Sequence, residues 1–287
     1  MAIETHDTTR CLLGEGALWH PEREQFLWCD ILSRRVLCRE GDVLRDWSFD
    51  RFVSCIAWVD RSRVVVATQS DLTLLDLDAN TRETLIPLEA DDPTTRSNDG
   101  RADPYGGFWI GTMGIDKAQG AGAIYRYVDG ELTCLRPNIT IPNAICFAPG
   151  GDLAYFADTV EGRIYRWPLD GSGWPVGEPE VFVDVSAMGL APDGAVCDSE
   201  GRVWVAKWGS SRVSVYSADG ALDKEVAFPA TQLTCPAFGG SDLTTLFCTS
   251  ATVHLPEAEV TANTSHGLTF RLDDAGKGLA EHRVRIG

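Results

Sequence analysis

The chain lacks the patterns that build several kinds of covalent framework and anchor. Its nine cysteines are odd in number and include no CxxC pair, which argues against a disulfide framework. Several of them lie in apolar runs such as FLWCD and TLFCTS, so we expect reduced, buried thiols. No apolar run approaches the length of a membrane span. The first ten residues, MAIETHDTTR, contain no apolar signal core, and we expect a cytoplasmic protein.

Motifs of several enzyme and cofactor classes are also missing. No GxSxG elbow and no HExxH helix occurs, and the five histidines are scattered. The segment from Asp76 to Asn80 begins like a calcium loop, but Thr81 stands where that loop needs glycine and Pro87 where it needs glutamate. The stretch 120–122 lacks the third glycine of a dinucleotide fingerprint. A serine hydrolase, a zinc protease and a nucleotide-binding enzyme are therefore disfavoured.

Basic residues are scarce relative to acidic ones. The chain has 25 Lys and Arg against 42 Asp and Glu, which gives a net charge of −17. Nucleic acid and anionic membrane surfaces would repel such a chain, so we expect neither as a partner. The hydrophobic content of 44% is enough for a substantial core.

The chain does contain an internal repeat. Six short apolar runs recur, most of them followed by a polar stretch and a second β-prone run. Their first core residues are Phe26, Val64, Phe108, Ala154, Val203 and Leu246, at spacings of 38, 44, 46, 49 and 43 residues. Four short strands in roughly 40–50 residues is the size of a propeller blade. The sequence predicts an all-β, six-bladed β-propeller of four-stranded blades, with residues 1–287 as one domain. Two tandem β-sandwiches would not explain six phased copies.

Polar residues occupy one phase of this repeat. The residues 10 or 11 positions before the first core residue are Glu15, Ser54, Asn98, Asn143, Asp193 and Cys235. The innermost strands of a propeller surround its axis, so Glu15, Asn98, Asn143 and Asp193 should converge there. Two carboxylates and two amides in one confined place favour a bound cation, and oxygen donors suit Ca²⁺, Mg²⁺ or Mn²⁺. Taken singly, Gly-Glu-Gly, Asn-Asp-Gly and Pro-Asp-Gly are also ordinary turn sequences.

Five stretches carry a family resemblance: LGEGALWHPEREQFLWCDI, RSNDGRADPYGGFWIGTM, IPNAICFAPGGDLAYFADT, APDGAVCDSEGRVWVAKWG and CPAFGGSDLTTLFCTSA. In these stretches the chain resembles the gluconolactonase, regucalcin and senescence-marker protein family. The resemblance implies a propeller with one divalent metal ion in its axial channel, held by Glu15, Asn143 and Asp193. It also implies that Arg96 and Asn98 line a substrate pocket. The metal could be Ca²⁺, Zn²⁺, Mn²⁺, Mg²⁺ or Fe²⁺.

The resemblance, joined to the polar cluster, predicts a divalent-metal-dependent sugar lactonase of the EC 3.1.1 type. Asp193 would act as general base, and Arg96 and Asn98 would orient the sugar lactone. Lys207 and Trp208 follow the fifth core run and are further candidates to reach the mouth of the channel, with Lys207 proposed to bind the substrate. We expect a monomer or weak dimer whose partner is the small-molecule lactone.

Two points stay open at this stage. The loop IDKAQGAGA follows the GTM motif, where animal regucalcins carry a glutamate, and its polar candidates are Asp116, Lys117 and Gln119. A calcium-binding regulatory propeller without turnover would use the same metal ligands, as would a propeller phosphotriesterase.

Overall fold

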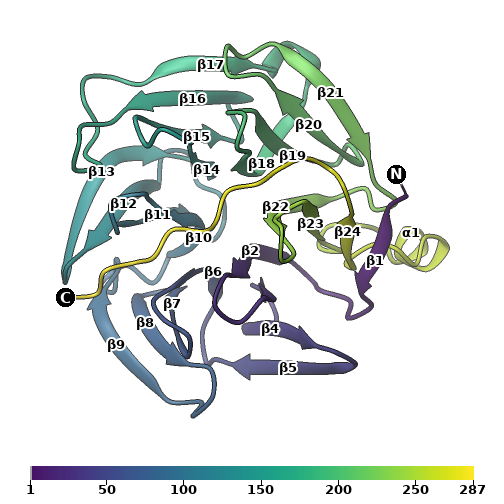
Figure 1. Cartoon of the computed structure of the whole chain (residues 1–287), viewed down its shortest axis with the longest axis horizontal. Helices are drawn as coiled ribbons and strands as arrows, with labels where there is room; N and C mark the ends of the chain where they lie inside the picture. Colours follow the sequence, from purple (N-terminus) through teal and green to yellow (C-terminus); the bar gives the residue numbers. More distant parts are fainter. Residues whose placement is uncertain (1) are drawn as a thin grey trace.

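Six four-stranded antiparallel sheets surround a central axis (Figure 1). The computed structural model describes residues 2–287. Blades 1 to 3 are β2 (Gly14–His20), β3 (Gln25–Asp30), β4 (Arg35–Glu40) and β5 (Val43–Ser48); β6 (Val53–Trp58), β7 (Arg63–Thr68), β8 (Asp71–Asp76) and β9 (Arg82–Pro87); and β10 (Thr95–Ala102), β11 (Phe108–Gly114), β12 (Gly122–Val128) and β13 (Glu131–Ile139).

Blades 4 and 5 follow the same order. They are β14 (Pro142–Phe147), β15 (Leu153–Asp158), β16 (Arg163–Pro168) and β17 (Glu180–Asp184); and β18 (Ala191–Cys197), β19 (Val203–Trp208), β20 (Arg212–Tyr216) and β21 (Leu222–Ala227). The predicted six-bladed propeller of four-stranded blades is confirmed.

The sixth blade joins the two ends of the chain. It consists of β22 (Leu233–Gly239), β23 (Thr245–Ser250), β24 (Thr269–Leu272) and, as its outermost strand, the N-terminal β1 (Glu4–Asp7). Strand β1 pairs antiparallel with β24, and Figure 1 shows the two side by side. The pairing of the first strand with the last closes the ring and covers an otherwise free sheet edge.

Large aromatic side chains pack between the blades at equivalent places. Trp109 and Trp204 are fully buried on the second strands of blades 3 and 5. Their indole N–H groups donate to Asp103 (3.1 Å) and Asp198 (2.9 Å), in the loops before those strands. These hydrogen bonds give both buried carboxylates a partner inside the protein, so we assign Asp103 and Asp198 a role in stabilising the core.

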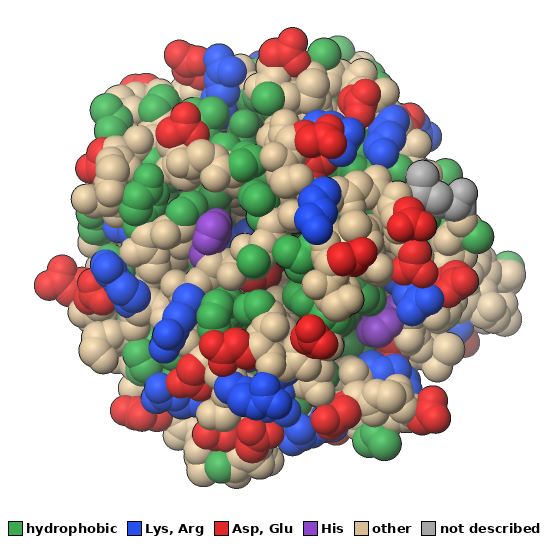
Figure 2. Space-filling model, viewed as in Figure 1, with side chains coloured by type: hydrophobic (Ala, Val, Ile, Leu, Met, Phe, Trp, Pro, Cys, Tyr) green, Lys and Arg blue, Asp and Glu red, His purple; other side chains and the backbone are tan. Residues whose placement is uncertain are grey.

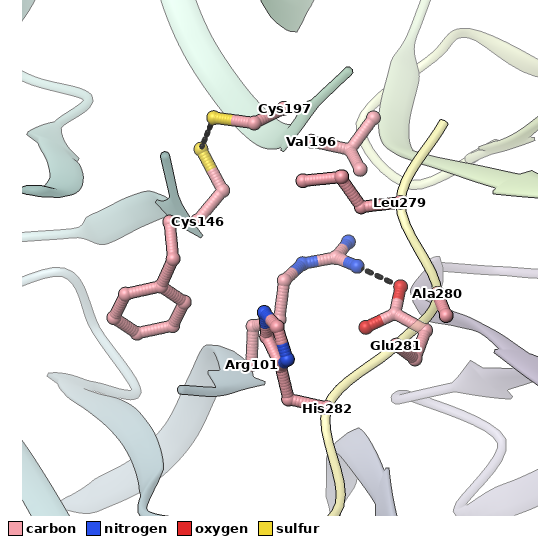
Figure 3. Close-up of a pocket in the computed structure, with 9 residues that line it drawn as sticks. Arg101, Cys146, Val196, Cys197, Leu279, Ala280, Glu281 and His282 are labelled. Carbon is pink, nitrogen blue, oxygen red and sulfur yellow. Dashed lines mark hydrogen bonds and ion pairs between the residues drawn. The ribbon is translucent and has the colours of Figure 1, made fainter. Parts of the chain in front are cut away.

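The C-terminal segment 276–287 crosses one face of the ring (Figure 1). The backbone N–H of Val284 donates to the carbonyl of Trp58 (3.0 Å), at the end of β6, and that of Arg285 donates to Gly106 (2.9 Å). Glu281 forms a buried ion pair with Arg101 of the innermost strand β10, as Figure 3 shows. These contacts cover that end of the axial channel.

The cysteines and the surface bear on the sequence-based expectations. Eight of the nine cysteines are buried and all are free thiols, but Cys134 is exposed. The sulfur atoms of Cys146 and Cys197, which lie on the innermost strands of adjacent blades, are 3.6 Å apart (Figure 3).

Acidic and basic side chains are interspersed on the face of the molecule that Figure 2 shows. The helices of residues 2–287 are α1 (Glu257–Ala262) and a 3₁₀ turn (Ser186–Met188), and neither could cross a bilayer.

Candidate functional site

All six innermost strands carry a break in register at the same level. The breaks lie between Glu15 and Leu18, Val53 and Cys55, Ser97 and Gly100, Asn143 and Cys146, Pro192 and Ala195, and Leu233 and Pro236. A bulge leaves extra residues unpaired and turns their side chains away from the regular alternation. The polar phase of the repeat therefore corresponds to a ring of bulges around the axis.

The tripeptides that resemble turns lie inside these strands. Gly-Glu-Gly is in β2, and Pro-Asp-Gly is in β18. A side chain at Gly16, where φ is 58°, would clash with the carbonyl oxygen of Ser54 on the next innermost strand. A Cβ at Gly194 would lie 2.8 Å from the carbonyl oxygen of Thr234. Glycine follows each acid because neighbouring backbones approach closely here.

The bulges face a cavity of about 360 Å³. Its polar lining includes Glu15, Arg96, Asn98, Asn143, Thr159 and Asp193, and most of its other lining side chains are apolar. Glu15 and Asn143 are near the first residues of their strands, whereas the C-terminal segment contacts the last residue of β6. The cavity thus opens at the end of the axis opposite that segment. Its volume suits a small molecule.

A chain of hydrogen bonds crosses blades 3, 4 and 5 along the wall of the cavity. The Arg96 guanidinium donates to Asn98 Oδ1 (2.9 Å), and Asn98 Nδ2 donates to Asn143 Oδ1 (3.1 Å). Asn143 Nδ2 donates to Thr159 Oγ1 (2.8 Å), and the Thr159 hydroxyl donates to the carbonyl of Pro192 (2.8 Å). Because Thr159 uses its only proton on Pro192, it can only accept from Asn143. The Asn143 amide is therefore fixed with its oxygen toward Asn98.

Two acids lie deep in the cavity beside one cation. Glu15 and Asp193 are each 5% exposed, and both line the same cavity. Burial, and then the charge of Asp193, raise the pKa of Glu15 well above its usual range. Burial, and then the charge of Asp99, do the same to the pKa of Asp193. Burial lowers the pKa of Arg96 to about 10, although the two acids oppose this.

This donor set fits a divalent cation. Two buried carboxyl groups that line one cavity repel one another when ionised, and Arg96 supplies a single positive charge. The Asn143 amide oxygen accepts one hydrogen bond and keeps a second lone pair. Within residues 2–287 no group of three or more His, Cys, Asp and Glu side chains has metal-binding geometry, so a site with three protein ligands here would include the Asn143 amide. Carboxylate and amide oxygens are ligands of hard cations.

The structure brings together five of the six predicted site residues. Glu15, Arg96, Asn98, Asn143 and Asp193 all line the cavity, but Lys207 does not. The Lys207 side chain is fully buried, with its Nζ 5.0 Å from the ring centre of Tyr216.

Of the two residues predicted after the fifth core run, Trp208 reaches the cavity and Lys207 does not. Trp208 lines the cavity, because successive residues of a strand point to opposite faces. Burial lowers the pKa of Lys207 to about 7, and its Nζ is among the buried polar atoms without a hydrogen-bond partner in residues 2–287. Of the three loop candidates, Lys117 lines the cavity, whereas Asp116 and Gln119 are not among its lining residues.

Several lining residues were missed at the level of sequence. Thr159 directly follows β15, and His254 lies in the irregular segment after β23. Both lie outside the innermost strands, so the spacing of the repeat does not indicate them. Phe52 and Ile115 lie on other inter-strand connections and contribute to the apolar lining. Of these, only Thr159 had a signal, since it follows a buried strand end in FADT.

Comparison with known proteins identifies the family. The family model described as the SMP-30/gluconolactonase/LRE-like region matches residues 13–252. The chain belongs to this family. The matched region contains every residue of the polar cluster, from Glu15 to Asp193.

Named relatives in this family include lactonases and a calcium-binding protein. The pentonolactonase XacC of Haloferax volcanii is 33% identical and aligns over 97% of both chains. The 6-deoxy-6-sulfogluconolactonase of Pseudomonas putida is 32% identical over 86% of this chain and 88% of its own. A crystal structure of a calcium-binding protein, regucalcin, from Agrobacterium tumefaciens is 40% identical, with a TM-score of 0.97 over 99% of this chain and 97% of that one.

Proposed function

We propose that the cavity hydrolyses a sugar-acid lactone with the help of one divalent metal ion. The observation that carries the proposal is the convergence of Glu15, Asn143 and Asp193 with Arg96 and Asn98 in one cavity of small-molecule size. The lactonase names of the relatives support the reaction class. Glu15, Asn143 and Asp193 would hold the metal ion.

We assign Arg96 and Asn98 to substrate binding and Asp193 to proton transfer. Arg96 is buried and donates to Asn98 Oδ1, so its remaining N–H groups would be fixed donors to the oxygens of the lactone. The Asn98 amide N–H groups already donate to Pro142 and Asn143, so Asn98 holds Arg96 in place and keeps one lone pair of Oδ1 for a hydroxyl of the sugar. Such fixed donors orient the ester carbonyl and meet the negative charge that develops on its oxygen. When bound, a divalent ion supplies Lewis-acid polarisation and lowers the pKa of water.

Asp193 is the proposed general base. It takes a proton from the water that attacks the carbonyl carbon, and the bond from that carbon to the ring oxygen then breaks. The proton passes to the ring oxygen, and the product is the open-chain hydroxy acid. Because Asp193 would also hold the metal ion, it is a weaker base there than a free carboxylate, and it takes its proton from a water that the bound ion makes more acidic.

A calcium-binding propeller without turnover is the second candidate, because the regucalcin relative is described as calcium-binding. A purely regulatory metal site has no need of the Arg96–Asn98 pair beside it. Burying a guanidinium is costly, and here it faces the cavity and not a dedicated acid partner. The pair therefore favours a site that binds and turns over a small polar molecule.

A panel of five- and six-membered aldonolactones tests the proposal. Protein treated with chelator is supplied with Ca²⁺, Zn²⁺, Mn²⁺, Mg²⁺ or Fe²⁺ in turn, and acid release is followed above the spontaneous rate. We expect metal-dependent turnover of at least one lactone. Metal binding by calorimetry with no turnover of any lactone would favour the regulatory candidate, and turnover of a phosphotriester alone would favour a phosphotriesterase.

A further inference from the structure

Two basic side chains from different blades meet at the cavity. Lys117 lies in the loop between β11 and β12, and His254 lies 137 positions further along, after β23. Lys117 Nζ and His254 Nε2 are 3.2 Å apart. Both side chains line the cavity and are otherwise exposed, so they belong to its mouth. The proposed hydrolysis uses neither of them.

The contact leaves the lysine charge without a partner. An ammonium group can only donate, so His254 Nε2 accepts in this pair. The ammonium keeps two further N–H donors. The ion pairs found in residues 2–287 include neither Lys117 nor His254. The adjacent acid, Asp116, instead accepts from the backbone N–H of Ala118 (3.0 Å).

Both side chains stand on backbone that is held in place. Lys117 and His254 have φ values of 63° and 67°, a region that few residues other than glycine adopt. The Lys117 N–H donates to the carbonyl of Gly114 (2.9 Å), and Gln232 Nε2 donates to the carbonyl of Val253 (2.8 Å). The pair is thus positioned before any ligand arrives, which lowers the entropy cost of binding.

The Lys117 ammonium is the cation of the cavity that has no acidic side chain beside it in the lining. The chain carries a net charge of −17, which repels anions at long range. Arg96, the other cation of the lining, lies among Glu15 and Asp193. Lys117 has apolar neighbours along the lining, such as Ile115. A neutral lactone would leave the ammonium unpaired, whereas a lactone with an anionic substituent would supply its partner.

We propose that Lys117 and His254 form an anion-binding subsite, so that the preferred lactone carries a carboxylate or another anionic group away from its ring ester. The Lys117 ammonium would donate to the anion, and His254 would hold the ammonium toward the cavity. This inference rests on the proposed lactonase function and narrows its substrate class.

The kinetic test compares lactones that differ in charge. The probes are gluconolactone, which is neutral, glucarolactone, which carries a free carboxylate, and 6-phosphogluconolactone. We expect kcat/KM to be higher for at least one charged lactone. In Lys117→Gln the ratio of charged to neutral kcat/KM should fall about tenfold to a hundredfold, the range for a hydrogen bond to a charged group. His254→Gln should lower the same ratio by a smaller factor.

A matched control separates this effect from a general loss of charge. Lys277, on the C-terminal segment, donates to the carbonyl of Asp242 (2.6 Å) and lies away from the cavity. Lys277→Gln should keep the parent ratio. An unchanged ratio in Lys117→Gln, in protein that unfolds at the parent temperature, would overturn the inference while leaving the lactonase proposal intact.

A binding measurement keeps the inference testable if no lactone is turned over. Calorimetry on metal-loaded protein compares glucarate with gluconate, which lacks the second carboxylate. We expect tighter binding of glucarate by the parent and loss of that preference in Lys117→Gln. Equal affinities for the two acids in the parent, together with no preference for a charged lactone, would show that the subsite does not exist.

Discussion

Replacing Thr159 by valine should weaken metal binding although Thr159 is not itself a proposed ligand. Its hydroxyl accepts from Asn143 Nδ2 and donates to the carbonyl of Pro192, both at 2.8 Å. Valine has nearly the same shape but makes neither hydrogen bond. The Asn143 amide would lose the contact of its Nδ2 and would be oriented only by the hydrogen bond that its Oδ1 accepts from Asn98.

The size of this effect follows from the two lost contacts. A buried polar group left without a partner costs about 1–3 kcal/mol. At 1.4 kcal/mol per factor of ten, the lower part of this range corresponds to roughly a tenfold change in affinity. Partners that orient metal ligands typically contribute about 10–100-fold in affinity. We therefore expect Thr159→Val to bind the metal ion about 10–100-fold more weakly.

Calorimetric titration of metal-free protein measures this affinity directly. The matched control is Thr68→Val, because Thr68 is buried and its hydroxyl also links two groups, but it does not line the cavity. Both variants should lose some thermal stability, but only Thr159→Val should lose metal affinity. Parent-like metal affinity in Thr159→Val, or equal losses in the two variants, would refute the account of how Asn143 is positioned.

Three further predictions follow from single residues. Glu15→Gln should bind the metal ion more weakly than the parent in the same titration, because a charged ligand is lost; an unchanged affinity would remove Glu15 from the ligand set. Lys207 has an ordinary pKa of 10.5 that burial lowers to about 7, so between these values the unfolded chain binds more protons and this group's contribution to stability rises with pH. Lys207→Met should flatten that rise in urea unfolding at pH 7 and pH 9 and should be more stable than the parent at pH 7, whereas the same slope in both proteins would contradict the lowered pKa of Lys207. Cys134 is the single exposed thiol of the nine, so native protein should take up one maleimide by intact mass, and rapid labelling of several thiols would contradict the buried positions of the others.

The repeat made the fold and most of the site predictable from sequence. The second strand of each blade carries an apolar run, and the bulged residue of the innermost strand lies 10 or 11 positions before the start of that run. This phase is what places Glu15, Asn143 and Asp193 together, although they are far apart in the chain. The family resemblance then supplied a reason to treat them as metal ligands.

The remaining features depend on contacts that carry no periodic signal. Strand β1 has only four residues, and its place in blade 6 is set by pairing with β24. The segment 276–287 has no strand pattern and is fixed by single hydrogen bonds. Lys207 and Trp208 were both predicted to reach the channel mouth, but only Trp208 lines the cavity, because successive residues of a strand point to opposite faces. Thr159 and His254 are brought to the cavity by inter-strand connections, whose path no pattern in the sequence predicts.

Asp193→Asn tests the central claim most directly. Asparagine keeps an oxygen ligand and suits the same backbone, so the variant should fold and still bind metal, though less tightly. It lacks the proton acceptor, and loss of a general base typically costs about 10²–10⁴-fold in rate. At saturating metal, on a lactone that the parent clearly hydrolyses, turnover above the spontaneous rate should fall by that order, whereas Asp219→Asn, an exposed acid of the same blade, should match the parent. Activity of Asp193→Asn within a few-fold of the parent would contradict the proposed mechanism.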